Sequence, residues 1–127
     1  GSPVEHSKSP AIHAAAYDFL GLDWDYGRYR IEPEELADFL RLRDDSWRGL
    51  SLTMPLKEVG YQLSEASCPV ASETGVVNTL VHTDSGWEGY NTDSFGKLGV
   101  FDACSDDGLS PELYAAVSVS FTFDACF

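Results

Sequence analysis

Side chains that can move a proton lie beside the predicted ends of strands and helices. Lys57 follows the apolar run at residues 49–53 and Pro55, and Asp93 precedes a predicted helix. A lysine next to a carboxylate in a partly dry cleft can pass a proton to or from a hydroxyl or carbonyl group. Both also have ordinary explanations, since most lysines are solvated and aspartate often caps a helix. The pair predicts proton transfer only if the fold brings the two side chains together.

Further hydrogen-bonding side chains occupy comparable places, namely Ser7, Ser9, Ser51, Thr53 and Asn78. The first two serines open a predicted helix, where hydroxyls and free backbone N–H groups can bind a carboxylate or phosphate. Simple capping of the helix is the alternative for both. Ser51 and Thr53 end a predicted strand, and Asn78 lies within the next one. Together with Lys57 and Asp93, these groups suit a small, polyhydroxylated, negatively charged molecule.

The hydrophobic pattern predicts the elements that position these side chains. A first helix is expected from its N-cap Ser9 to Gly21, with an apolar face toward the core made of Ile12, Ala15, Ala16, Phe19 and Leu20. The later elements, in chain order, are a strand at 24–31, a helix from Pro33, a buried strand at 49–53, a helix from Pro55 to about Leu63, and a hairpin with strands at 76–81 and 87–90.

Strands that alternate with helices predict an α/β fold. We expect a single three-layer domain with a mostly parallel sheet flanked by helices, made mixed by the hairpin. In a parallel sheet, the carboxyl ends of strands share an edge with the N-termini of the following helices, so the candidate side chains would converge there. Residues 1–104 are expected to form this domain, and residues 105–127 a linker with a β-prone tail.

Composition excludes several classes of function. The chain has 127 residues and a net charge of -13, which argues against a nucleic-acid partner because phosphate binding needs clustered Lys and Arg. The chain contains no run of about 18 apolar residues, so the sequence predicts no membrane span. The 3 cysteines share no C-x-x-C spacing, and the 3 histidines form no ligand pattern. We therefore expect no metal site, no disulfide framework and a cytoplasmic setting.

Four short motifs in order resemble a known family. Residues 6–10 read H-S-K-S-P, and residues 51–57 read S-L-T-M-P-L-K, which is similar to [N/S]-x-T-x-P-x-K. Residues 75–79 are similar to G-A-x-N-T, and residues 89–96 to G-x-N-T-D-x-x-G. Each motif is modest alone, but together they are specific, and they cover about residues 1 to 100. The chain resembles the N-terminal, substrate-binding half of the shikimate dehydrogenases.

The resemblance implies a role for each matching residue. Ser7, Ser9 and Thr53 would hold the substrate carboxylate, and Asn78 would bind a ring hydroxyl. Lys57 and Asp93 would be the catalytic pair beside the hydroxyl that becomes a ketone. Ser51 stands where many relatives have asparagine, and its side chain keeps a donor and an acceptor but is shorter. The implied reaction is the NADP-dependent interconversion of 3-dehydroshikimate and shikimate in aromatic amino-acid precursor synthesis, with quinate as a competing substrate.

The chain also departs from the family pattern. The family fold begins with a strand just before the position of Gly1, and its second half is a nucleotide-binding domain with a glycine-rich phosphate loop. Residues 117–123 lie about where that loop would follow a strand, and they contain no glycine. Without glycine, the backbone cannot approach a pyrophosphate closely. We therefore expect no NADP binding and no activity from this chain alone. A stand-alone shikimate- or quinate-binding or regulatory module without redox activity is the alternative, and a fragment without a working pocket is a third hypothesis.

The tail carries one further pattern. Apolar residues at 117, 119, 121 and 123 alternate with Ser118, Ser120 and Thr122, which predicts a half-buried strand. Such a strand can pair with the sheet in place of the missing first strand, or with a second copy of the chain as a homodimer.

Overall fold

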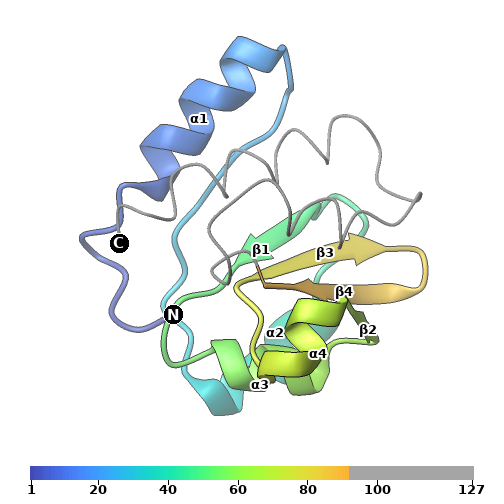
Figure 1. Ribbon diagram of the computed structural model, residues 1–127. Helices are drawn as coiled ribbons and strands as arrows, with labels where there is room; N and C mark the ends of the chain where they lie inside the picture. The colour runs from blue at the N-terminus through green and yellow to red at the C-terminus, as the bar shows by residue number, and fades with distance from the viewer. Residues whose placement is uncertain (92–127) are drawn as a thin grey trace.

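The computed structural model describes residues 1–91, and its strands form one mixed sheet (Figure 1). The helical elements are α1 (Ser9–Leu20), the short 3₁₀ helix η1 (Pro33–Glu35), α2 (Leu36–Arg41), α3 (Lys57–Leu63) and α4 (Pro69–Thr74). The strands are β1 (Gly49–Ser51), β2 (Ala66–Ser67), β3 (Thr79–Thr83) and β4 (Gly86–Tyr90). In Figure 1, α2, α3 and α4 lie together below the sheet and α1 lies above it.

The sheet has the strand order β1-β3-β4-β2. Strands β3 and β4 form the predicted hairpin, with Thr79 opposite Tyr90 and Thr83 opposite Gly86. Gly86 has φ of 122°, a backbone conformation that favours glycine at this turn. The β1–β3 and β3–β4 pairings are antiparallel and only β2–β4 is parallel. The α/β class and the mixed sheet are confirmed, but the expectation of a mostly parallel sheet is wrong for the described strands.

The hydrophobic core lies between this sheet and the helices α2, α3 and α4. Its fully buried side chains include Leu36, Leu56, Val77, Leu80 and Val81. Close packing is required at Gly60 in α3, where a Cβ atom would collide with Leu52 and press on Val77. The core therefore fixes the turn after β1 against the start of α3.

Helix α1 ends at Gly21 as predicted, but it buries a different face. Gly21 adopts the left-handed conformation with φ of 69°, and its N–H closes the last turn. Phe19 is 91% exposed and Leu20 41% exposed, so the predicted apolar face does not point into a core. The buried residues of α1 are instead Ser9, His13 and Tyr17. The prediction chose the buried face from the aliphatic side chains, whereas this helix packs through the rings of His13 and Tyr17.

Ring contacts hold α1 to the segment that follows it. His13 stacks on Tyr26 with ring centroids 4.1 Å apart, and Tyr17 meets Trp24 edge-on at 5.5 Å. The cap also differs from the prediction, because Lys8 is the N-cap and Ser9 is the first helical residue. A helix anchored by stacked aromatic rings needs no continuous aliphatic stripe.

Four further predictions about the elements need correction. Residues 24–31 were expected to form a strand but have no strand pairing in the described structure. The strand predicted at residues 49–53 is shorter, and as the outer strand β1 it is partly exposed rather than buried. Helix α3 begins at Lys57 instead of Pro55, and Asn78 precedes β3 instead of lying within it. A strand needs a neighbour to satisfy its backbone groups, and residues 24–31 have no adjacent strand among those described.

Candidate functional site

The turn between β1 and α3 places Lys57 at the start of its helix. Leu56 N–H donates to the Thr53 carbonyl at 2.9 Å, and Lys57 is the first residue of α3. The Lys57 carbonyl in turn accepts a hydrogen bond from Val77 N–H at 3.0 Å. The backbone of Lys57 is therefore fixed to the segment before β3, and its half-buried side chain lines a cavity.

Asn78 is anchored in the same network. Its carbonyl accepts from Leu52 N–H at 2.6 Å, its N–H donates to the Tyr90 carbonyl at 3.0 Å, and its side-chain Oδ1 accepts from the Thr79 hydroxyl. Only 3% of Asn78 is exposed. The end of β1 and the segment before β3 meet because these strands are antiparallel, not because the sheet is parallel as the sequence argument assumed.

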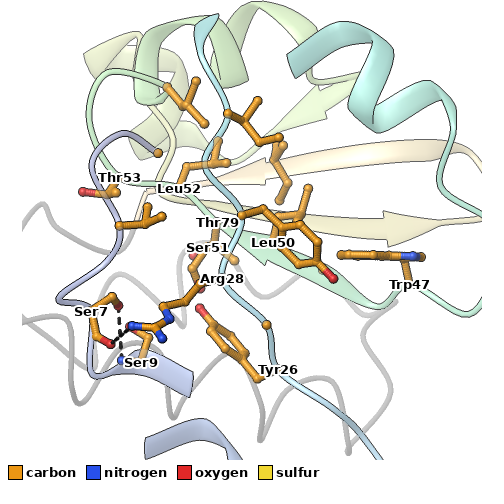
Figure 2. Close-up of a pocket in the computed structure, with 18 of the residues that line it drawn as sticks. Ser7, Ser9, Tyr26, Arg28, Trp47, Leu50, Ser51, Leu52, Thr53 and Thr79 are labelled. Carbon is orange, nitrogen blue, oxygen red and sulfur yellow. Dashed lines mark hydrogen bonds between the residues drawn. The ribbon is translucent and has the colours of Figure 1, made fainter. Parts of the chain in front are cut away.

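Ser7 and Ser9 lie together at the N-terminus of α1. Ser9 N–H donates to Ser7 Oγ at 3.3 Å, and Ser9 is buried while Ser7 is half-buried. Figure 2 shows these two serines beside Arg28 on one side of the cavity, with Trp47 at the opposite end. Two hydroxyls and a guanidinium close together can hold a carboxylate.

Sequence reasoning missed Arg28. Its Nη1 donates to the Glu5 carbonyl at 2.6 Å and to the Ser7 carbonyl at 3.5 Å, so it holds the loop that presents Ser7 and Ser9. A signal was available, since the chain has only 8 basic residues and a negative ligand would need positive charge nearby. Arg28 is one of three basic residues, with Arg48 and Lys57, that line the cavity.

The cavity brings most of the predicted site residues together. Its volume is about 1080 Å³, and Ser7, Ser9, Ser51, Thr53 and Lys57 all line it. Asn78 is anchored at the same sheet edge but is absent from the cavity lining. Asp93 lies outside the described residues. The structure thus groups five of the seven predicted side chains around one space.

Burial shapes the electrostatics of the wall formed by α1. Burial lowers the pKa of His13, and the Ser9 carbonyl that bonds its Nδ1 at 2.9 Å only partly opposes this. Burial, with a smaller contribution from Tyr26, raises the pKa of Tyr17 to about 12. Both rings are therefore neutral near pH 7, which leaves Arg28, Arg48 and Lys57 to attract an anion.

A second amide lies at the same sheet edge. Asn91 is 2% exposed, and its Nδ2 donates to Thr74 Oγ1 at 2.9 Å. This contact ties the end of β4 to α4, two positions before Asp93 in the chain. In the sequence, Asn91 stands out only as part of the motif at residues 89–96, because its partner Thr74 is remote along the chain.

The described strand-to-helix connections lack the glycine-rich turn that is typical of a dinucleotide site. Glycine-rich turns between a strand and a helix let the backbone approach a pyrophosphate. The described connections from strand to helix are residues 52–56, after β1, and Cys68, after β2, and neither contains glycine. Within residues 1–91, no group of three or more His, Cys, Asp or Glu side chains can hold a metal ion. In that same part of the chain, no helix has the length and apolar character to cross a membrane.

Comparison with known proteins identifies the family. Residues 1–80 match the model of the shikimate dehydrogenase substrate binding domain. A shikimate dehydrogenase (NADP(+)) from Anaeromyxobacter sp. (strain Fw109-5) is 44% identical over 112 residues, which cover 87% of this chain and 39% of the relative. One from Methanosarcina barkeri is 42% identical over 76% of this chain and 35% of the relative. The chain thus spans less than half the length of these curated relatives.

Solved structures agree with this match. A crystal structure of Mycobacterium tuberculosis shikimate dehydrogenase superposes with a TM-score of 0.71 at 40% identity, covering 73% of this chain and 36% of that one. The Thermus thermophilus shikimate 5-dehydrogenase in complex with NADP(H) and shikimate gives a TM-score of 0.72 at 32% identity, covering 100% of this chain and 51% of that one. The chain therefore belongs to the shikimate dehydrogenase family, and its residues 1–80 match the substrate-binding domain of that family.

Proposed function

We propose that this chain is the substrate-binding half of a shikimate dehydrogenase and binds shikimate or 3-dehydroshikimate in the cavity. The observation that carries the proposal is that Ser7, Ser9, Thr53 and Lys57, from segments distant in sequence, line one space. The Thermus thermophilus relative, which superposes over the whole chain, was crystallised with shikimate and NADP(H). We assign residues 1–104 to this domain and residues 105–127 to the linker and tail.

The substrate carboxylate is proposed to lie near the start of α1. Ser7 and Ser9 supply hydroxyls there, Thr53 supplies another from the turn after β1, and Arg28 adds positive charge. A local cation is needed because the net charge of -13 opposes an anionic ligand at long range. Ser51 and Asn78 are proposed to bind ring hydroxyls from the sheet edge.

Lys57 and Asp93 are proposed to manage the proton of the reacting hydroxyl. The Lys57 ammonium can donate a hydrogen bond to the oxygen that becomes an alkoxide, and a carboxylate beside it fixes its orientation and charge. In the whole family enzyme, NADP supplies the hydride chemistry. This chain's residues bind the substrate, orient it and hold the proton at its oxygen.

We propose that the chain alone does not turn over its substrate. The strand-to-helix turns of the described part lack the glycine that a pyrophosphate requires. That observation also favours a second candidate function, a stand-alone shikimate- or quinate-binding module without redox activity. Quinate carries one additional hydroxyl, and acceptance of it in this cavity is part of that second candidate. A cytoplasmic location stays a prediction from the cysteine pattern.

The test combines calorimetric titration with an activity assay. We expect shikimate to bind the purified chain and NADP to give no turnover with it. Ser7→Ala and Ser9→Ala should each weaken binding about tenfold, because each removes one hydrogen bond to a charged group. Ser85→Ala, which removes the same atom in the exposed β3–β4 turn, should leave binding unchanged. Turnover would contradict the proposed inactivity, and absence of binding would leave a fragment without a working pocket.

A further inference from the structure

Thr79 is a polar residue of the cavity wall that the proposed substrate contacts do not include. It is the first residue of β3 and lines the cavity, although only 4% of it is exposed. Asn78, the residue before it, is similarly buried but does not line the cavity. Thr79 therefore offers the ligand space a hydroxyl in addition to the side chains already assigned.

The hydrogen bond to Asn78 fixes how the Thr79 hydroxyl can act. Its Oγ1 donates to Asn78 Oδ1 at 3.0 Å, and both residues are buried. A threonine hydroxyl has one proton to donate and two lone pairs that accept. Because the proton is directed to Asn78, only the lone pairs are left for a ligand. Toward the cavity, Thr79 is therefore an acceptor, and its partner must be a donor.

The backbone holds this acceptor in place. The Asn78 carbonyl accepts from Leu52 N–H at 2.6 Å, and the Asn78 N–H donates to the Tyr90 carbonyl at 3.0 Å. Thr79 itself is paired with Ser51 of β1 on one side and with Tyr90 of β4 on the other. Inner strands of a sheet open less readily than loops do. The lone pairs of Thr79 Oγ1 therefore keep their direction.

Ser51 supplies the complementary group on the neighbouring strand. It lies directly opposite Thr79 in the antiparallel pairing of β1 with β3, and both residues line the cavity (Figure 2). Opposite side chains stand on the same face of a sheet, with Cβ atoms about 4.5–5.5 Å apart. One ligand oxygen with two hydrogen bonds of about 2.7–2.8 Å can bridge two hydroxyl oxygens roughly 4.5 Å apart. Ser51 is exposed, so its hydroxyl can turn to donate where Thr79 accepts.

We propose that Thr79 and Ser51 bind one ring hydroxyl of the substrate, which donates to Thr79 Oγ1 and accepts from Ser51 Oγ. This assignment rests on the proposed function, since it takes shikimate as the ligand of the cavity. A secondary alcohol is both donor and acceptor, so it satisfies both side chains. A carbonyl or ether oxygen cannot donate to Thr79. Thr79 is thus a specificity-determining residue that selects a hydroxyl at this position of the ring.

The selected hydroxyl is not the one that reacts. The oxygen beside Lys57 loses its proton when it becomes a ketone, and a ketone cannot donate to Thr79. A contact that shikimate and 3-dehydroshikimate share therefore needs a hydroxyl that both compounds keep. Thr79 and Ser51 hold the ring through this unchanged substituent, which stabilises both bound ligands equally.

Calorimetric titration of the whole chain tests this assignment. Thr79→Val removes the hydroxyl and should weaken the binding of shikimate and of 3-dehydroshikimate by the same factor, about tenfold. Thr79→Ser keeps the hydroxyl and should bind within about twofold of the wild type. Thr83→Val is the matched control, because Thr83 Oγ1 also donates at 3.0 Å, to the Gly86 carbonyl at the other end of β3. That variant should leave binding unchanged.

Analogues of shikimate that each lack one ring hydroxyl separate a direct contact from a structural effect. The wild type should bind the analogue without the selected hydroxyl about tenfold more weakly than shikimate. Ser51→Ala and Thr79→Val should bind that same analogue about as well as the wild type does, since the contact is already lost. Fluorine in place of this hydroxyl accepts but cannot donate, so the wild type should bind the fluoro analogue no better than the deoxy one. This last measurement needs no variant of the buried threonine.

Each alternative outcome has its own consequence. If the wild type binds shikimate and Thr79→Val binds it equally well, Thr79 makes no contact and the proposed function still stands. If Thr79→Val weakens every deoxy analogue by the same factor, its effect is structural and the assignment is wrong. Tight binding of the fluoro analogue would show that the ring hydroxyl does not donate, which also overturns it. A wild type that binds no shikimate would overturn the proposed function and this assignment together.

Discussion

The wall of the cavity formed by the turn after β1 is tied to the sheet by backbone hydrogen bonds, whereas the wall formed by residues 23–31 rests on ring contacts. Leu52, Lys57 and Asn78 each form backbone hydrogen bonds of 2.6 to 3.0 Å with residues of adjacent segments. On the other wall, Tyr26 stacks on His13, and Tyr29 contacts the rings of Phe39 in α2 and of Trp47. Lys57, proposed to act on the proton, lies with Thr53 on the first, more rigid wall, whereas Arg28, proposed to help hold the carboxylate beside Ser7 and Ser9, lies on the second, looser one.

This difference separates two functional requirements. A proton-transfer group must keep its position relative to the reacting oxygen, because misplacement by about 1 Å can reduce the rate about a hundredfold. A carboxylate can be held by several donors, and the loss of one weakens binding by a smaller factor. We therefore expect substitutions on the rigid wall to have the larger effects.

The largest effect is expected at Lys57. In a longer protein that joins this chain to the cofactor domain of a relative, Lys57→Ala should lower kcat about 10²–10⁴-fold and change KM little, since the lysine acts on charge that develops during the reaction. Steady-state kinetics with shikimate measures both constants. Arg41→Gln, which removes an exposed charge on α2, is the control and should match the parent. A raised KM with unchanged kcat would remove Lys57 from the catalytic role.

The next prediction compares the loss of stability caused by a substitution in β3 with the loss caused by one in α1. Leu80 in β3 is fully buried, and Leu80→Ala should lower the free energy of unfolding by about 2–5 kcal/mol. Phe19→Ala removes a larger side chain from α1, but Phe19 is 91% exposed, so the change should stay within about 0.5 kcal/mol. Urea unfolding measures both. Equal losses would show that α1 buries Phe19 against something outside the described residues.

Arg28 allows a matched test of the looser wall. Arg28→Gln should weaken shikimate binding about tenfold, because the guanidinium organises the Glu5 and Ser7 carbonyls and adds charge beside the serines. Arg30→Gln makes the same charge change two residues away. The Arg30 side chain is 64% exposed and forms surface ion pairs with Glu5 at 3.6 Å and Glu32 at 3.7 Å, so binding should change less than about twofold. Calorimetry would contradict the role of Arg28 if the two variants weakened binding equally.

The rigid half was predicted well from the sequence because its signals are local. The hairpin of β3 and β4 carries its own turn chemistry, and Pro33 marks the beginning of η1 and α2. Lys57 after an apolar strand and a proline is also a local pattern. The antiparallel pairing of β1 with β3 was not predicted, because pairing direction depends on contacts between residues about 30 positions apart.

The looser half was predicted poorly because its contacts are between remote side chains. The apolar residues of α1 suggested a core-facing stripe, but His13 and Tyr17 are buried instead through rings at residues 24 and 26. The role of Arg28 was not predicted because its partners are the backbone carbonyls of residues 5 and 7. Every residue has such a carbonyl, so the residue types do not identify these acceptors. Residues 24–31 read as a strand from their composition, but pairing needs a neighbour that the described structure lacks.

The smallest effect is expected from the titration of His13, which reports on the packing of the looser wall. Its folded pKa is lowered by burial, so the unfolded chain binds the proton more readily than the folded one. The stability that His13 provides is therefore complete above its unfolded pKa, about 6.5, and is lost progressively as the pH falls below it. Lowering the pH from about 7.5 to about 5 should destabilise the wild type relative to His13→Phe, which keeps a ring against Tyr26 but cannot titrate.

The His13→Phe variant is needed because the stability of the chain as a whole changes with pH in the opposite direction. With a net charge of -13, protonation of surface carboxylates relieves repulsion and tends to stabilise the folded state as the pH falls. Only the difference between the unfolding free energies of wild type and His13→Phe isolates the histidine. A constant difference across this pH range would show that water reaches His13, and hence that α1 does not pack on residues 24–26 as tightly as the stacked rings require.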